Sequence, residues 1–205
     1  MISDKINSIG QSISPLQSGQ RGVTLIDAMI ALVIFSIGML AIAALQTVSK
    51  TSNFEAIQRS HGASLTYDLF ERMRMNTGAL LTYVPGGSVE YKYSDTLTTP
   101  SADCSVNACS SSDMANWDLY EFQQMLRGDN EKVGTKNMGG IVKPTVCITG
   151  PTNGQYTLTI VWRGQTKITN QNASTCGSEA GIGAYDNAAH DDFAYRRILS
   201  INTYL

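Results

Sequence analysis

The feature that most constrains this chain is an apolar run close to its N-terminus. From Ala28 to Leu45 the sequence is AMIALVIFSIGMLAIAAL, apolar apart from Ser36 and Gly38. At a rise of 1.5 Å per residue, a helix over these positions would span about 27 Å, close to the hydrocarbon thickness of a bilayer. The sequence therefore predicts one membrane-spanning helix.

The residues on either side of the run suggest how it is oriented. Lys5 and Arg21 precede it and favour a cytoplasmic N-terminus, although Lys50 and Arg59 follow it. Four cysteines all come later in the chain, in an even number and at irregular spacing, which is typical of disulfides in an oxidising compartment. We therefore expect the C-terminal side to face that compartment. The four are Cys104, Cys109, Cys147 and Cys176.

An acidic residue, Asp27, stands next to the start of the run. A charged side chain at the centre of a membrane helix costs about 2.5–3.5 kcal/mol on insertion scales, and less near the interface. One interpretation places Asp27 at headgroup depth, where it stabilises the first helical turn through the helix dipole. The other needs a positive partner, which the chain offers only if it is cut just upstream.

Residues 21–27, RGVTLID, followed by an apolar helix resemble the class III signal of type IV prepilins. The resemblance implies that a prepilin peptidase cuts after Gly22 and that the new N-terminus, Val23, is N-methylated. Asp27 then fills the acidic fifth position of the mature chain, where it would meet the N-terminal amine of an adjacent subunit. Desolvation offsets much of that attraction, so we expect it to set register more than stability. This chain has Val23 where the family usually has Phe, and Asp27 where it usually has Glu.

Two other interpretations of the N-terminal region remain. Ala41-Ile42-Ala43 fits the cleavage site of an ordinary secretory signal, although the polar segment before the apolar run is long for one. An uncleaved signal anchor is the third possibility. The mature chain would begin at Val23, Ala44 or Met1, respectively.

The helical pattern continues beyond the apolar run. Thr24 to Met75 contains no proline and predicts a single helix that ends at Asn76-Thr77-Gly78. Its second half is predicted to be amphipathic and to pack one face on a domain. His61 falls on that face and is predicted to be a core histidine. The apolar stripe comprises Phe54, Ile57, His61, Leu65 and Leu69.

The remaining residues predict a small head domain with one helix and a sheet. A helix capped by Ser112 or Asp113 should run through Leu126 and end at Gly128, with Trp117 and Tyr120 as core anchors. Three strands are expected, and hairpin-type links between them imply an antiparallel sheet. The predicted class is α+β. The strands are 142–149, 155–163 and 196–204.

Three stretches and the paired cysteines further resemble the PilV branch of minor pilins, the type IV pilus modification proteins. The stretches are SIGMLAIAALQ, YTLTIVWRG and RRILSINTYL. The resemblance implies a disulfide-bonded head and a role in pilus assembly or priming, at the filament tip, or in adhesion or twitching motility. Its implied partners are the prepilin peptidase/N-methyltransferase, other minor and major pilins, and the inner-membrane assembly platform.

The expected organisation has three parts: a cleaved leader (1–22), a long helix (23–76) whose transmembrane or assembly half is 23–46, and a periplasmic head (77–205). Four cysteines allow three pairings. We favour Cys104–Cys109, which would close a tight loop, and Cys147–Cys176, which would join the first strand to the segment before the last.

Nothing in the chain predicts an enzyme, a cofactor, a metal or a nucleic-acid partner. The net charge is -2, no basic run occurs, and GxSxG, Walker A, HExxH and GxGxxG are all absent. His190-Asp191-Asp192 is interpreted as part of a solvated surface loop. The alternatives to a minor pilin are a type II secretion pseudopilin and a membrane-anchored periplasmic binding or sensor protein.

Overall fold

The computed structural model describes residues 22–168, 174–178, 185 and 194–205. The chain divides into an N-terminal unit, Met1–Gln46, and a folded unit, Thr47–Leu205, which are considered separately. A single helix, α1 (Leu25–Met75), contributes to both. It ends one residue before the predicted stop at Asn76. The leader lies outside the described residues, apart from Gly22.

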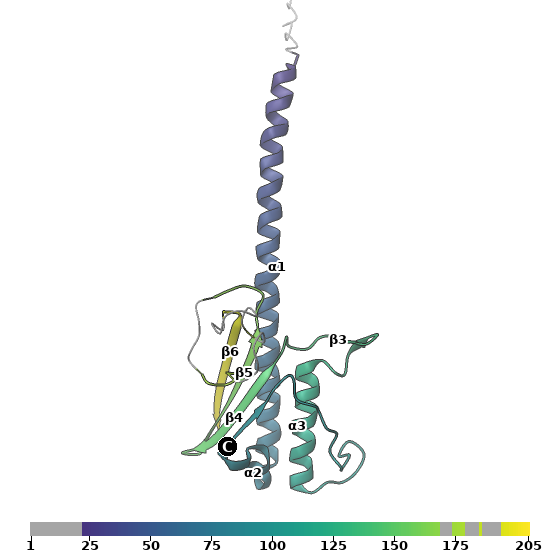
Figure 1. Ribbon diagram of the computed structural model, residues 1–205, viewed down its shortest axis with the longest axis vertical. Helices are drawn as coiled ribbons and strands as arrows, with labels where there is room; N and C mark the ends of the chain where they lie inside the picture. Colours follow the sequence, from purple (N-terminus) through teal and green to yellow (C-terminus); the bar gives the residue numbers. More distant parts are fainter. Residues whose placement is uncertain (1–21, 169–173, 179–184, 186–193) are drawn as a thin grey trace, which may run out of the picture. The chain divides into compact units, whose positions relative to one another are not determined.

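A four-stranded antiparallel sheet forms the centre of the folded unit (Figure 1). The strand order is β1-β4-β5-β6. β4 pairs with β5, and β5 pairs with β6, each in an antiparallel arrangement. The predicted α+β fold with a long N-terminal helix is confirmed. The strands are β1 (Ser88–Tyr91), β4 (Thr145–Thr152), β5 (Gln155–Arg163) and β6 (Arg196–Tyr204). A separate small hairpin joins β2 (Lys132–Val133) to β3 (Lys136–Asn137).

The first predicted strand was misplaced. β4 starts at Thr145 rather than at residue 142 and continues to Thr152, through a register shift that follows Thr149. The strand starts later than predicted because the backbone N–H of Val142 donates to the side chain of Gln58, 3.0 Å away. The hairpin turn is therefore shorter than the predicted five residues. The other two predicted strands have the bounds that the sequence indicated.

β5 is buried on both faces, which its alternating sequence did not indicate. Tyr156, Leu158 and Ile160 face the main core. Val161, on the opposite face, is also fully buried because Cys176 and Tyr185 cover it. The alternation within β5 does not reveal this cover, because Cys176 and Tyr185 come later in the sequence.

The second half of α1 packs on the sheet, but through a different stripe from the predicted one. Leu65 and Leu69 are buried as expected, whereas Ile57 is 55% exposed. His61 is half-buried and lines a shallow surface cavity, so its prediction as a core histidine is wrong. The buried stripe is rotated because it includes small or hydrogen-bonded residues that the apolar pattern omits. It comprises Gln58, Gly62, Leu65, Thr66, Leu69, Phe70 and Met73.

Gly62 explains how closely α1 and the sheet approach each other. A Cβ atom at this position would already contact side-chain atoms of Ile141, Ile160 and Leu199 at 3.5–3.6 Å. Any larger side chain would have to displace these residues. Gly62 therefore lies where α1 contacts the sheet.

A second long helix, α3 (Ser111–Arg127), packs against the end of α1. Ser110 caps it by accepting a hydrogen bond from the Asp113 N–H, so the cap lies two residues before the predicted Ser112. Gly128 ends the helix as predicted, in the left-handed conformation with φ of 68°. Between the two helices lie η1 (Thr77–Ala79), α2 (Leu80–Tyr83) and η2 (Pro85–Gly87).

One charged cluster fastens α1 to α3. Arg72 contacts three carboxylates, those of Asp68, Asp118 and Glu121, at 2.7–2.9 Å. Tyr83 donates to the second oxygen of Asp118. Burial of Arg72 opposes its charge, but its hydrogen bonds to the carboxylates outweigh this, so its pKa lies above the ordinary value. Arg72 therefore stays charged wherever the protein is folded.

Candidate functional site

The N-terminal site begins with an accessible peptide bond. Gly22 and Val23 precede the first residue of α1 and are not helical. Val23 is 80% exposed, and a Cβ atom at Gly22 would meet nothing within 4 Å. A protease could reach this bond without unwinding the helix, because the bond precedes the first helical residue.

Thr24 and Asp27 form a reciprocal cap at the start of α1. The Thr24 backbone N–H and Oγ1–H both donate to Asp27 Oδ2, at 3.1 and 2.6 Å. In return the Asp27 N–H lies 3.4 Å from Thr24 Oγ1. This arrangement is a capping box, with Asp27 at the third helical position. The sequence analysis missed Thr24, although the spacing T-x-x-D was the signal that could have identified it.

The apolar residues that follow are exposed on every side of the helix. From Leu25 to Leu45 the large apolar side chains are 53–78% exposed. The one hydroxyl within this stretch, that of Ser36, donates to the Leu32 carbonyl oxygen one turn earlier, at 2.7 Å. α1 is the one helix in the described parts of the chain that is long and apolar enough to cross a membrane. This surface can be covered by lipid or by similar helices.

The four cysteines form two disulfides in the folded unit. Cys104 is joined to Cys109, and Cys147 of β4 is joined to Cys176. These are the two pairs that the sequence analysis favoured. Glu90 lies within 4.8 Å of the sulfur atoms of the second pair, which is a spacing that a metal site could use. Since both sulfurs are in the disulfide and Glu90 accepts from the Gly177 N–H at 3.0 Å, the group offers no thiolate ligand.

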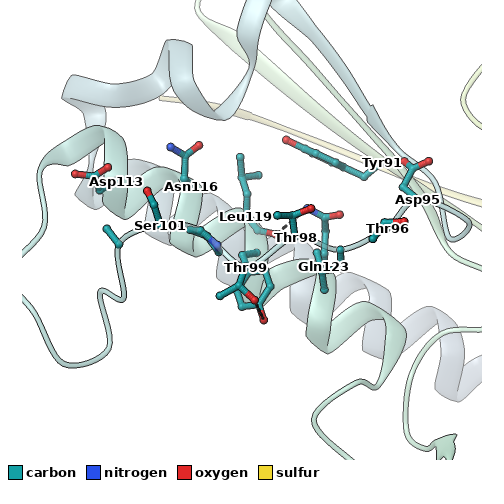
Figure 2. Close-up of a pocket in the computed structure, with 14 residues that line it drawn as sticks. Tyr91, Asp95, Thr96, Thr98, Thr99, Ser101, Asp113, Asn116, Leu119 and Gln123 are labelled. Carbon is teal, nitrogen blue, oxygen red and sulfur yellow. Dashed lines mark hydrogen bonds between the residues drawn. The ribbon is translucent and has the colours of Figure 1, made fainter.

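A polar cavity of about 370 Å³ lies between α3 and the segment that follows β1 (Figure 2). Arg127 holds this segment by donating to the carbonyl oxygens of Lys92 and Asp95, at 3.0 and 2.7 Å. Tyr120, predicted to be a core anchor, is half-buried at the cavity and lies 3.2 Å from Thr99 Oγ1. The lining includes Thr96, Thr98, Ser101, Asp113, Asn116 and Gln123.

The titratable side chains that line this cavity are carboxylates and tyrosines. No histidine, cysteine, lysine or arginine occurs among the described residues that line it. Its two carboxylates each already accept a hydrogen bond, Asp95 from the Lys92 N–H and Asp113 from the Ser110 hydroxyl. The His190-Asp191-Asp192 cluster lies outside the described residues.

Two family models match consecutive parts of the chain. Residues 17–43 match the model described as Prokaryotic N-terminal methylation motif, which includes Gly22, Val23 and Asp27. Residues 44–120 match the model described as Type IV pilin Tt1218. Together the two matches cover residues 17–120 and support a type IV pilin-like assignment. No curated protein and no solved structure matches the chain.

The two family matches relate the N-terminal features to a role in the cell. Type IV pilins are structural subunits, so the chain is not an enzyme, as the sequence analysis predicted. The methylation motif implies processing by a prepilin peptidase and assembly with other pilins. The exposed bond, the capped acid and the apolar surface all lie within that motif or directly after it.

Proposed function

We propose that this pilin is a minor subunit of a type IV pilus, of the PilV type, and that it acts in pilus assembly or priming and at the filament tip. The peptidase cuts it between Gly22 and Val23 and methylates the Val23 amine. Before assembly it spans the inner membrane once through residues 23–46, with the leader (1–22) in the cytoplasm and the head (77–205) in the periplasm. Its partners are then other minor and major pilins and the assembly platform.

The observation that carries the proposal is the order of features along the first turns of the chain. An exposed Gly22–Val23 bond is followed within four residues by a capped carboxylate and then by a fully exposed apolar helix. Cleavage would place a cationic amine near this carboxylate in a bundle of similar helices. A charge pair in such a setting chiefly selects register, because desolvation offsets much of the attraction.

The first test is the mass of the N-terminal peptide in sheared filaments. The proposal expects N-methylated Val23. A chain that begins at Ala44 would indicate an ordinary secretory signal, and one that begins at Met1 would indicate an uncleaved anchor. Either result would contradict the proposed processing.

The second test separates the charge of Asp27 from its role in the helix cap. Asp27→Asn keeps an oxygen that can accept the Thr24 hydrogen bonds but removes the negative charge. We expect this variant to be processed normally and to enter filaments about tenfold less than the wild type, which corresponds to about 1.4 kcal/mol. Asp27→Glu, which keeps the charge, is the matched control. Equal incorporation of the Asn variant would remove the proposed charge pairing.

A pseudopilin of a type II secretion system is the second candidate, because the matched methylation motif is common to both filament systems. Deletion of the gene distinguishes them. Loss of surface pili, with protein secretion unchanged, would support the pilus assignment. Loss of secreted enzymes with intact pili would support the secretion system, and roles in adhesion or twitching motility would then be excluded.

A further inference from the structure

A second cavity lies in the folded unit, beside the ends of β5 and β6. Its volume is about 320 Å³, and its walls come from α1, β5 and β6. Trp162 and Arg197 are directly opposite each other in the β5–β6 pair, so both side chains lie on the same face of the sheet. Glu55 and Arg59 contribute from α1, and two isoleucines, Ile168 and Ile198, complete the wall.

The cavity has more hydrogen-bond donors than acceptors. Trp162 is 2% exposed, and its Nε1–H has no acceptor among the described residues. The same holds for Nη1 of Arg197, another buried atom. Buried donors in folded proteins are nearly always paired, so two donors without an acceptor among the described residues favour an acceptor that this part of the chain does not supply.

The carboxylate already present cannot be that acceptor. Both oxygens of Glu55 are used by Arg197, through Nε and Nη2 at 2.9 Å each. Glu55 Oε1 also accepts from the Gln165 N–H at 2.8 Å. Its charge is therefore balanced by Arg197.

The second guanidinium gives the cavity a net positive charge. Arg59 is exposed at the cavity and has no ion pair within the part of the chain that the structure describes. Two guanidiniums against one carboxylate leave a single positive charge, which suits a ligand with a single negative charge. Carboxylates match guanidinium groups well, because two oxygens can accept parallel N–H donors.

We propose that this cavity binds a carboxylate group carried on a short aliphatic stem. The carboxylate oxygens accept from Trp162, Arg197 and Arg59, and the stem packs against Ile168. Two sources share this chemistry: the acidic side chain of a neighbouring filament subunit, and a small free carboxylate.

The test uses the tryptophan side chains as reporters, because the chain has only two. The full ¹⁵N-labelled chain in detergent micelles gives two indole N–H signals, which Trp117→Phe assigns. Titration with sodium propionate should shift the Trp162 signal to saturation and leave that of Trp117 unchanged. Sodium chloride at equal ionic strength and neutral propionamide should not reproduce the shift. An unmoved Trp162 signal, or an equal shift with chloride, would overturn the proposal.

Two variants test whether the charge of Arg59 is used. Arg59→Gln should weaken propionate binding about threefold or more, because it removes a charged donor at the cavity. Lys50→Gln removes the same charge from an exposed position on α1 outside the cavity, and should bind propionate like the wild type. Equal affinities of the two variants would overturn the assignment of Arg59.

Filament incorporation then distinguishes the two sources of the carboxylate. If a neighbouring subunit supplies it, Arg59→Gln should enter filaments about threefold less than Lys50→Gln. If the ligand is a small free carboxylate, the two variants should be incorporated equally while still differing in propionate affinity. Propionate affinity does not depend on how the N-terminus is processed, so this proposal can fail independently of the proposed function.

Discussion

Glu55 on α1 and Arg197 on β6 form a two-point ion pair, although they lie 142 residues apart in the sequence. Both contacts measure 2.9 Å, and the two side chains are only 20% and 14% exposed. The geometry is the parallel arrangement in which guanidinium and carboxylate groups bind most strongly. This pair therefore ties the last strand of the sheet to the helix.

Removing the carboxylate of this pair should destabilise the folded unit. Glu55→Ala leaves Arg197 as a partly buried charge without its partner, and we expect the free energy of unfolding to fall by about 2 kcal/mol. Glu71→Ala is the matched control, because Glu71 pairs with Arg74 at an exposed position and should cost about 0.5 kcal/mol or less. Urea unfolding of the full chain measures both. Equal losses would show that burial adds nothing to the Glu55 pair.

Gly128 should tolerate no side chain. It has φ of 68°, and a Cβ atom there would clash with the Met138 carbonyl oxygen. We expect Gly128→Ala to cost about 3 kcal/mol or more. Gly134 has φ of 65° but open space around it, so Gly134→Ala isolates the backbone cost, about 1 kcal/mol. Equal thermal stabilities of the two variants would show that the close approach at Gly128 is relieved by movement of the loop.

The two disulfides should contribute unequally to stability. Cys147–Cys176 joins residues 29 apart, and its loss should cost about 3 kcal/mol by loop-closure entropy. Cys104–Cys109 joins residues 5 apart, and its loss should cost less, about 2 kcal/mol. Unfolding of the two double-alanine variants compares them, and non-reducing peptide mapping checks the pairing. A peptide that joins Cys104 to Cys147 or Cys176 would contradict the structure.

Alkaline pH should weaken the fold through two buried tyrosines. Burial raises the pKa of Tyr83, helped by its hydrogen bond to Asp118, and burial also raises the pKa of Tyr185 above the ordinary 10.0. The folded chain therefore keeps protons that the unfolded chain releases. Their contribution is complete below pH 10 and is lost as the pH rises toward the folded pKa values.

Urea midpoints measured between pH 8 and pH 12 test this expectation. The double variant Tyr83→Phe/Tyr185→Phe should be about 2 kcal/mol less stable at neutral pH, because it loses side-chain hydrogen bonds. Its stability should nevertheless fall less steeply above pH 10. Tyr67→Phe, at a 58% exposed position, is the control and should keep the wild-type slope. An unchanged slope in the double variant would assign the alkaline loss to other groups.

The N-terminal features could be predicted because each depends on residues close together in the sequence. The apolar run, the Gly22–Val23 bond and the acid four residues later are local patterns, and so are the helix end near Asn76 and the stop at Gly128. The strands β5 and β6 were also predicted from local sequence, β5 from the alternation of Tyr156, Leu158, Ile160 and Trp162.

The features that were missed depend on contacts across the fold. Gln58 is polar yet 5% exposed, because its side chain bonds Gly140 and Val142, more than eighty residues later. β1 is only four residues long and is stabilised by pairing with β4. The donor-rich cavity likewise exists only where Trp162 and Arg197 meet across two strands.

The cap formed by Thr24 and Asp27 also has a consequence for subunits that are not yet assembled. The backbone N–H and the hydroxyl of Thr24 already donate to the Asp27 carboxylate. In a lone subunit these donors replace hydrogen bonds that water would make at the edge of the bilayer. Unassembled precursors can then remain in the membrane without an external counter-ion for Asp27. When the subunit joins a filament, Asp27 exchanges the Thr24 donors for those of a neighbouring subunit. Its carboxylate therefore has hydrogen-bond donors both before and after assembly.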